Sequence, residues 1–207
     1  MKKIIVIGSG GHARVVIDTL ISLNFDIQGI IDVNFKNQKE KILNYPILGD
    51  FKKLNEFDIK KNLICIAIGD INIKQKYIDL ILSYGFKTPT IIHPSAFVSK
   101  NSIIGQGVFV NAKSTINAEA KVDDHSLINS NSIVEHEVVI GKNCHICPGV
   151  KIAGRVKIGD NTFVGIGSNI INNINIGDNV IIGAGTVVIK DVKSNSKIVG
   201  NPGREIK

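Results

Sequence analysis

The segment Val134-Glu135-His136-Glu137 places one histidine between two carboxylates. A histidine titrates close to neutral pH, and an adjacent carboxylate can fix its tautomer and stabilise the imidazolium ion. This pattern is therefore typical of a general base. The alternative is a surface histidine in a polar turn, and the local pattern alone does not separate the two interpretations.

The other histidines and the cysteines do not form a pattern that suits a metal ion. The histidines are His12, His93, His125 and His145, and no two of them are spaced to bind zinc from one helix. The segment Cys144-His145-x-Cys147 has an unsuitable spacing, so we expect no metal site. Three cysteines are an odd count with no disulfide framework.

A second candidate site follows the apolar run 4–7, which ends in the glycine-rich segment 8–13 (GSGGHA). A helical pattern leads from there to a second apolar run that ends at Asp32. This order predicts a βαβ unit whose helix N-terminus binds an anion and whose acid binds a ribose or a base. His12 is either a ligand contact or a capping residue of that helix.

The glycine pattern alone would suit a dehydrogenase that binds NAD. Only 62–70 and 88–94 are further candidate strands of this region, with a helix over 74–86 between them. About 90 residues cannot hold a complete two-halved dinucleotide fold and a substrate domain, so we expect a half-size unit for one nucleotide. Gly69, at the end of a predicted strand, belongs to the edge of the sheet where ligands collect.

An apolar residue recurs every six positions from Ile92 to Val188, and all 17 positions are Ile or Val. This period predicts a triangular solenoid with three short strands per coil of 18 residues. Ala118 and Gly154 lie one coil before and one coil after His136, so small residues would leave room for a ligand beside the imidazole. The same repeat can equally be pure scaffold.

The composition is that of a globular protein, with 43% hydrophobic and 21% charged residues. The net charge is +7, but the lysines are scattered and no aromatic residues interleave with them, so small phosphate-bearing ligands are favoured over nucleic acid. No stretch of about 18 apolar residues exists for a membrane span, and the N-terminus does not resemble a signal peptide. We therefore expect a cytoplasmic protein.

Three segments together carry a more specific resemblance: GSGGHARVVID near the N-terminus, the region from Asn129 to Ser168, and the ending VGNPGREI. With the hexad repeat, they resemble the bacterial sugar O-/N-acetyltransferase family, which belongs to the hexapeptide-repeat acyltransferases. The resemblance covers essentially the whole chain. It implies an α/β N-terminal domain (a half-Rossmann-like βαβ unit) followed by a left-handed parallel β-helix, with domains at 1–90 and 91–190 and a tail at 191–207.

The resemblance also assigns roles to residues. It implies that His136 is the general base and that Glu137 is its partner. It implies acetyl-CoA contacts from His145, Gly154, Gly183 and Ala184. It implies that the nucleotide-linked sugar is bound by Gly10, Gly11, His12, Arg14, Asp32 and Gly69. One departure from the family pattern is Asp70 with Lys74, where family members often have Asn and Arg, so a phosphate contact there is in doubt.

The implied activity is acetyl transfer from acetyl-CoA, as co-substrate, to the amino group of a nucleotide-linked amino sugar of the UDP-4-amino type. Such a reaction would serve the synthesis of a bacterial surface glycan or glycoprotein. The resemblance also implies that the protein is a homotrimer. O-acetylation of sialic acid or a related nonulosonic acid is one alternative, and a non-catalytic nucleotide-binding solenoid is another. The sequence does not identify the sugar or the nucleotide.

Overall fold

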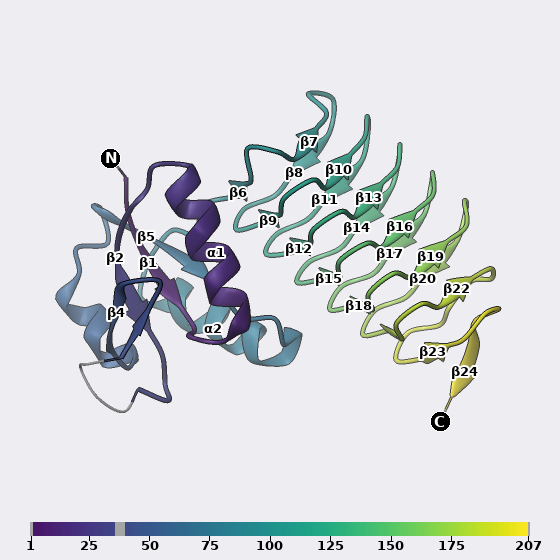
Figure 1. Ribbon diagram of the computed structural model, residues 1–207. Coiled ribbons are helices and arrows are strands. Elements are labelled where there is room, and N and C mark those ends of the chain that lie inside the picture. Colours follow the sequence, from purple (N-terminus) through teal and green to yellow (C-terminus); the bar gives the residue numbers. More distant parts are fainter. Residues whose placement is uncertain (1, 36–39, 207) are drawn as a thin grey trace. The chain divides into compact units, whose positions relative to one another are not determined.

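The computed structural model describes residues 2–35 and 40–206, which form two compact units, Met1–Pro89 and Thr90–Lys207. The first unit is a five-stranded sheet in the order β3-β4-β2-β1-β5 with two helices and one 3₁₀ helix (Figure 1). Its strands are β1 Lys3–Ile7, β2 Asp26–Ile31, β3 Lys41–Ile42, β4 Tyr45–Gly49 and β5 Asn62–Ile66. Its helices are α1 Gly11–Ser22, α2 Ile71–Ser83 and the 3₁₀ helix Phe51–Glu56.

The predicted βαβ unit is confirmed as β1, α1 and β2, in which β1 pairs in parallel with both β2 and β5. The run Ile4–Ile7 is completely buried, as expected for a parallel strand that is covered on both faces. Gly8 then turns the chain with φ +103°, and a Cβ at this position would collide with the side chain of Ile68. The tight loop that leads into α1 therefore requires glycine here.

Two strand predictions for this unit were wrong. The hairpin of β3 and β4 was missed, because it turns through Leu43 and Asn44 at positive φ (47° and 71°) and lacks the usual glycine. The segment 88–94 is not a strand of this sheet, because Ile91 and Ile92 pair with Phe109 and Val110 in the second unit. Ile92 is itself the first residue of the hexad repeat, which explains this pairing.

The second unit is a parallel β-helix whose coils stack three short strands on three faces (Figure 1). Face 1 contains β7 Phe97–Val98, β10 Thr115–Ile116, β13 Ile133–Val134, β16 Lys151–Ile152, β19 Asn169–Ile170 and β22 Val187–Val188. Face 2 contains β8 Ile103–Ile104, β11 Lys121–Val122, β14 Val139–Ile140, β17 Lys157–Ile158 and β20 Asn175–Ile176. Face 3 contains β6 Ile91–Ile92, β9 Phe109–Val110, β12 Leu127–Ile128, β15 His145–Ile146, β18 Phe163–Val164, β21 Ile181–Ile182, β23 Lys197–Val199 and β24 Arg204–Ile206.

The repeat positions form the core of this unit, since the anchors from Val110 to Val188 are all buried. Buried hydroxyls line the same interior and bond to carbonyls of the next coil; Ser126 Oγ, for example, donates to the carbonyl of Gly141 at 2.7 Å. The last coil is shorter, because Ile182 pairs with Ile198 and not with a residue 18 positions on. β24 then closes the end of face 3 by antiparallel pairing with β23.

Candidate active site

His136 lies in the turn that follows β13, on the edge between face 1 and face 2 (edge 1–2). Its Nδ1 is 2.9 Å from Oε2 of Glu137, and the imidazole is 55% exposed. Because an ionised carboxylate can only accept a hydrogen bond, Nδ1 carries the proton of the neutral ring. The lone pair is then on Nε2, which is the form that a general base needs.

Arg155, which was not predicted from the sequence as a site residue, completes this group. Its Nε donates to the same Oε2 of Glu137 at 3.0 Å. The hydrogen bonds from His136 and then from Arg155 hold the pKa of the Glu137 carboxyl below its usual value. Glu137 therefore stays ionised, and keeps its hydrogen bond to the imidazole, at pH values where an ordinary glutamate begins to protonate.

Gly154 lies directly against the His136 ring. A Cβ at position 154 would be 2.5 Å from Cε1 and 2.6 Å from Nε2 of the imidazole. The turns that carry the two residues are joined by a bond from the amide of Arg155 to the carbonyl of His136, at 3.1 Å. Glycine is thus what leaves room for the Cε1–Nε2 edge of the imidazole against the next coil.

The second carboxylate of the motif is directed to another partner. Oε2 of Glu135 accepts a hydrogen bond from Nδ2 of Asn117, one coil earlier, at 2.9 Å. Glu137, and not Glu135, is therefore the carboxylate hydrogen-bonded to the imidazole of His136.

The residues predicted to contact acetyl-CoA are divided between two edges of the solenoid. Gly154 is beside His136 on edge 1–2, whereas Gly183 and Ala184 follow β21 on the edge between face 3 and face 1 (edge 3–1). His145 belongs to β15 on face 3, is 9% exposed, and contacts Phe163 edge to face at 5.3 Å. Within one chain, the predicted base and most of the predicted acetyl-CoA residues are thus separated by the width of face 1.

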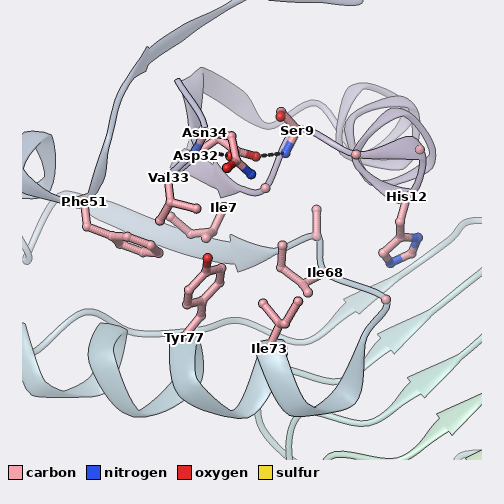
Figure 2. Close-up of a pocket in the computed structure, with 15 residues that line it drawn as sticks. Ile7, Ser9, His12, Asp32, Val33, Asn34, Phe51, Ile68, Ile73 and Tyr77 are labelled. Carbon is pink, nitrogen blue, oxygen red and sulfur yellow. Dashed lines mark hydrogen bonds between the residues drawn. The ribbon is translucent and has the colours of Figure 1, made fainter. Parts of the chain in front are cut away.

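The first unit contains a cavity of about 470 Å³ at the carboxyl ends of β1, β2 and β5 (Figure 2). Five of the six residues predicted to bind the nucleotide line it: Gly10, Gly11, His12, Asp32 and Gly69. The apolar side of the cavity is formed by Val33, Phe51, Ile73 and Tyr77, which were not predicted from the sequence. Phe51 and Tyr77 pack edge to face with their ring centroids 4.8 Å apart.

The carboxylate of Asp32 is hydrogen-bonded to the backbone on both of its oxygens, so its role is not limited to ligand binding. One carboxylate oxygen accepts the amide of Ser9 at 2.7 Å, and the other accepts the amide of Asn34 at 2.8 Å (Figure 2). Asp32 therefore fastens the glycine loop to the end of β2. Burial raises the pKa of Tyr77, and the negative charge of Asp32 raises it further.

The two helices that border the cavity present different N-termini. The N-cap residue of α1, Gly10, has no side chain to bond the amides of the first turn. The N-cap of α2 is Asp70, whose carboxylate accepts the amides of Asn72 and Ile73, both at 2.9 Å. Arg14 is not among the residues that line the cavity, and its guanidinium donates to the carbonyl of Gly10 at 3.2 Å. An anion would therefore meet a helix N-terminus without an acidic cap at α1 and a carboxylate at α2.

Residues 2–35 and 40–206 contain no group of three or more His, Cys, Asp or Glu side chains that could hold a metal ion. None of the helices in the same ranges is long and apolar enough to cross a membrane.

Two family models match the chain. The PglD N-terminal domain matches residues 3–81, and the bacterial transferase hexapeptide repeat matches residues 119–154 and 155–190. Among solved structures, PerB from Caulobacter crescentus, in complex with CoA and GDP-perosamine, is 33% identical with a TM-score of 0.93. This similarity covers 99% of the present chain and 97% of PerB.

The chain belongs to the bacterial sugar O-/N-acetyltransferase family. The acetyltransferase domain of PglB from Neisseria gonorrhoeae FA1090 is a second relative, with 30% identity, a TM-score of 0.93 and complete coverage of both chains. Perosamine N-acetyltransferase from Caulobacter crescentus has also been solved with one histidine replaced by asparagine or by alanine. The predicted fold, an α/β domain followed by a left-handed parallel β-helix, is confirmed by these full-length similarities.

Similarity to curated sequences is less extensive. UDP-N-acetylbacillosamine N-acetyltransferase of Bacillus subtilis (strain 168) is 31% identical over 118 residues, which are 54% of this chain and 52% of that enzyme. The matched part thus spans about half the length of this curated relative.

Proposed function

We propose that the protein is an acetyl-CoA-dependent N-acetyltransferase that acts on the amino group of a nucleotide-linked amino sugar. The observation that carries this proposal is the His136–Glu137 pair, in which the imidazole keeps its Nε2 lone pair beside Gly154. The full-length similarity to an enzyme solved with CoA and GDP-perosamine supports the same chemistry.

In the proposed reaction, the amine nitrogen of the sugar attacks the carbonyl carbon of the acetyl thioester. A C–N bond forms, and the amine proton moves to Nε2 of His136, whose positive charge is stabilised by Glu137. Backbone N–H groups near Gly154 stabilise the negative oxygen of the tetrahedral intermediate. The C–S bond then breaks, the CoA thiolate leaves and takes the proton, and the product is an amide.

A covalent acetyl-enzyme is not part of this scheme. Cys144 and Cys147 are buried, and burial raises the pKa of the Cys147 thiol to about 12. At neutral pH such a thiol is protonated and a poor nucleophile, so direct transfer accounts better for the site.

We propose that the cavity of the first unit binds the nucleotide. The start of α1, which has no side-chain cap and no acidic residue in its first turn, suits the phosphates, since the carboxylate of Asp70 repels an anion from the start of α2. The nucleobase would then occupy the opposite, apolar side of the cavity, next to Phe51 and Tyr77. The chain is similar both to an enzyme named for a UDP-linked sugar and to one solved with a GDP-linked sugar, so the test below includes both nucleotides.

We further propose a homotrimer with active sites between subunits. His136 lies on edge 1–2, while Gly183 and Ala184 lie on edge 3–1 of the same chain. A site that uses both sets therefore needs a second copy of the chain. Light scattering should give three times the chain mass of 22.4 kDa, and a monomer at micromolar concentration would contradict an intersubunit site.

The location that suits this reaction is the cytoplasm, where acetyl-CoA and nucleotide-linked sugars are available together. We propose that the protein acts there.

The test is release of the CoA thiol from acetyl-CoA in the presence of UDP-, GDP- and dTDP-linked amino sugars, CMP-sialic acid and free sialic acid. We expect release with one amino sugar and a product that resists mild alkali, as an amide does. A product that mild alkali hydrolyses would identify an ester and refute N-acetylation. No thiol release with any of these acceptors, although the protein still binds acetyl-CoA, would refute the proposed acceptor.

A further inference from the structure

Glu135, the carboxylate on the other side of His136, forms a side-chain pair that the solenoid itself does not need. Its Oε2 accepts a hydrogen bond from Nδ2 of Asn117 at 2.9 Å. The two residues occupy the same position in successive coils, directly after β13 and β10. The next three coils carry Ala153, Ile171 and Ile189 at this position. The coils therefore stack without an amide–carboxylate pair here.

The hydrogen bond between the two side chains leaves two acceptor atoms unused. An ionised carboxylate can only accept, so the part of Asn117 that faces it is the NH₂ group, and Oδ1 is turned away. Oε1 of Glu135 and Oδ1 of Asn117 make no other hydrogen bond to residues 2–35 or 40–206. Both side chains are half-buried. Such a pair suits a ligand group that donates, such as a hydroxyl, and its charged member binds the donor more strongly.

The pair lies beside the proposed base. Glu135 directly precedes His136, whose imidazole edge lies against Gly154 in the following coil, whereas the carboxylate of Glu135 is turned to Asn117 in the preceding coil. These two outer coils are two steps, or about 10 Å, apart. With a hydrogen bond of about 3 Å at each end, a ligand spans them with two polar groups about 4 Å apart or less. Two substituents on adjacent carbons of one sugar ring meet this condition.

We propose that Glu135, held by Asn117, binds the hydroxyl group on the ring carbon next to the amine of the acceptor sugar. This inference rests on the proposed function and names the feature of the sugar that the site recognises. With the amine at Nε2 of His136, the neighbouring hydroxyl donates to Oε1 of Glu135, and the ring is held at two points. The adjoining coils leave room for the ring because they carry short side chains: Ala118, Ala153 and Gly154.

The test compares thiol release with the active nucleotide-linked amino sugar and with its deoxy analogue, in which hydrogen replaces this hydroxyl. For the wild-type protein we expect kcat/KM to be about tenfold or more lower with the deoxy analogue, because a hydrogen bond to a charged group is lost. Glu135→Ala should lower kcat/KM for the intact sugar by a similar factor and have little further effect on the deoxy analogue. Damage to the fold or to the base would instead lower both values equally.

Glu119→Ala is the matched control. Glu119 lies on the same edge one coil before Glu137, is exposed, and has no side-chain hydrogen bond or ion pair with the part of the chain that the structure describes. Its replacement removes the same charge near the base and should leave the ratio of kcat/KM for the two sugars at the wild-type value. Asn117→Asp is a second variant, in which a carboxylate replaces the amide and repels Glu135. It should lower kcat/KM more for the intact sugar than for the deoxy analogue.

An equal loss for both sugars in Glu135→Ala, or no loss for either, would overturn the role of Glu135. Equal kcat/KM values for the two sugars in the wild-type protein would overturn the contact with the hydroxyl. Both results leave the proposed function standing, because the wild-type protein still transfers the acetyl group. No thiol release by the wild-type protein with any nucleotide-linked amino sugar would refute the proposed function, and the role of Glu135 with it.

Discussion

Replacing Gly154 by alanine should displace the proposed base while leaving the fold intact. The added Cβ would be 2.5 Å from Cε1 and 2.6 Å from Nε2 of His136, whereas ordinary contact begins near 3.4 Å. The backbone on both sides is held by bonds between coils, including the amide of Asn173 to the carbonyl of Gly154 at 3.1 Å. The imidazole, which is 55% exposed, must therefore move by about 1 Å or swing toward solvent.

A displacement of about 1 Å at a reacting group can cost about 10²-fold in rate, which corresponds to about 2.7 kcal/mol. Stability should not fall with it, because Gly154 does not require a positive φ. Where the backbone suits alanine, the exchange of glycine for alanine stabilises by roughly 0.4–1 kcal/mol through the unfolded state. We expect a loss of about 10²-fold in kcat with an equal or higher Tm.

The assay is thiol release with the active acceptor, run as a double-mutant cycle with His136→Ala. If Gly154→Ala acts by displacing the imidazole, it should have little further effect once the imidazole is gone. An equally large loss in the His136→Ala background would mean that the methyl group acts on the backbone N–H or on acetyl-CoA. Full activity of Gly154→Ala would refute the placement of the His136 ring.

Arg155→Ala removes one of the two hydrogen bonds that lower the pKa of Glu137, so that pKa should rise. Protonation of Glu137 would then begin at higher pH. As the pH is lowered, kcat/KM of the variant should therefore start to fall at a higher pH than kcat/KM of the wild-type protein; superimposed pH profiles would contradict this. Asp32→Ala should raise KM for the nucleotide-linked sugar by about tenfold with kcat nearly unchanged, because the glycine loop loses its attachment to β2; steady-state kinetics at saturating acetyl-CoA tests it, and an unchanged KM refutes it. Burial raises the pKa of Cys65 and of Cys147 to about 12. The native protein should therefore react slowly with a thiol reagent at neutral pH, whereas all three thiols of the unfolded chain should react. Rapid reaction of the native protein would contradict the burial.

The solenoid could be predicted from sequence because its interior accepts little other than Ile and Val. Each anchor from Val110 to Val188 is buried, so the six-residue period corresponds to the three-dimensional repeat. The short last coil could not be predicted in this way. After Val188 the next buried anchors are Val192 and Ile198, which break the period by two residues.

The first unit was harder to predict because its pairings are set by tertiary contacts. The hairpin of β3 and β4 carries a leucine at positive φ in its turn, where a pattern search looks for Gly or Asn-Gly. The apolar side of the cavity is likewise assembled from separate elements. Phe51 comes from the 3₁₀ helix and Tyr77 from α2, and no spacing in the chain connects them.

The contact between His136 and Glu137 could be predicted from the local motif, whereas Arg155 was missed. A usable signal existed, because Arg155 lies 18 residues after Glu137 and the same step links His136 to Gly154. The step identifies which turns stack, but it does not say which atoms meet. That the guanidinium reaches the carboxylate of Glu137 depends on side-chain conformations that only the structure supplies.

The most direct test of His136 as the general base is the initial rate of CoA release from acetyl-CoA with the nucleotide-linked amino sugar, compared between the wild-type protein and His136→Ala. His93→Ala serves as the matched control, since it removes a histidine from the first coil of the same solenoid. We expect rapid release by the wild-type protein and by His93→Ala, and a loss of about 10²-fold or more in His136→Ala with an unchanged Tm. Release by His136→Ala at the wild-type rate would contradict it.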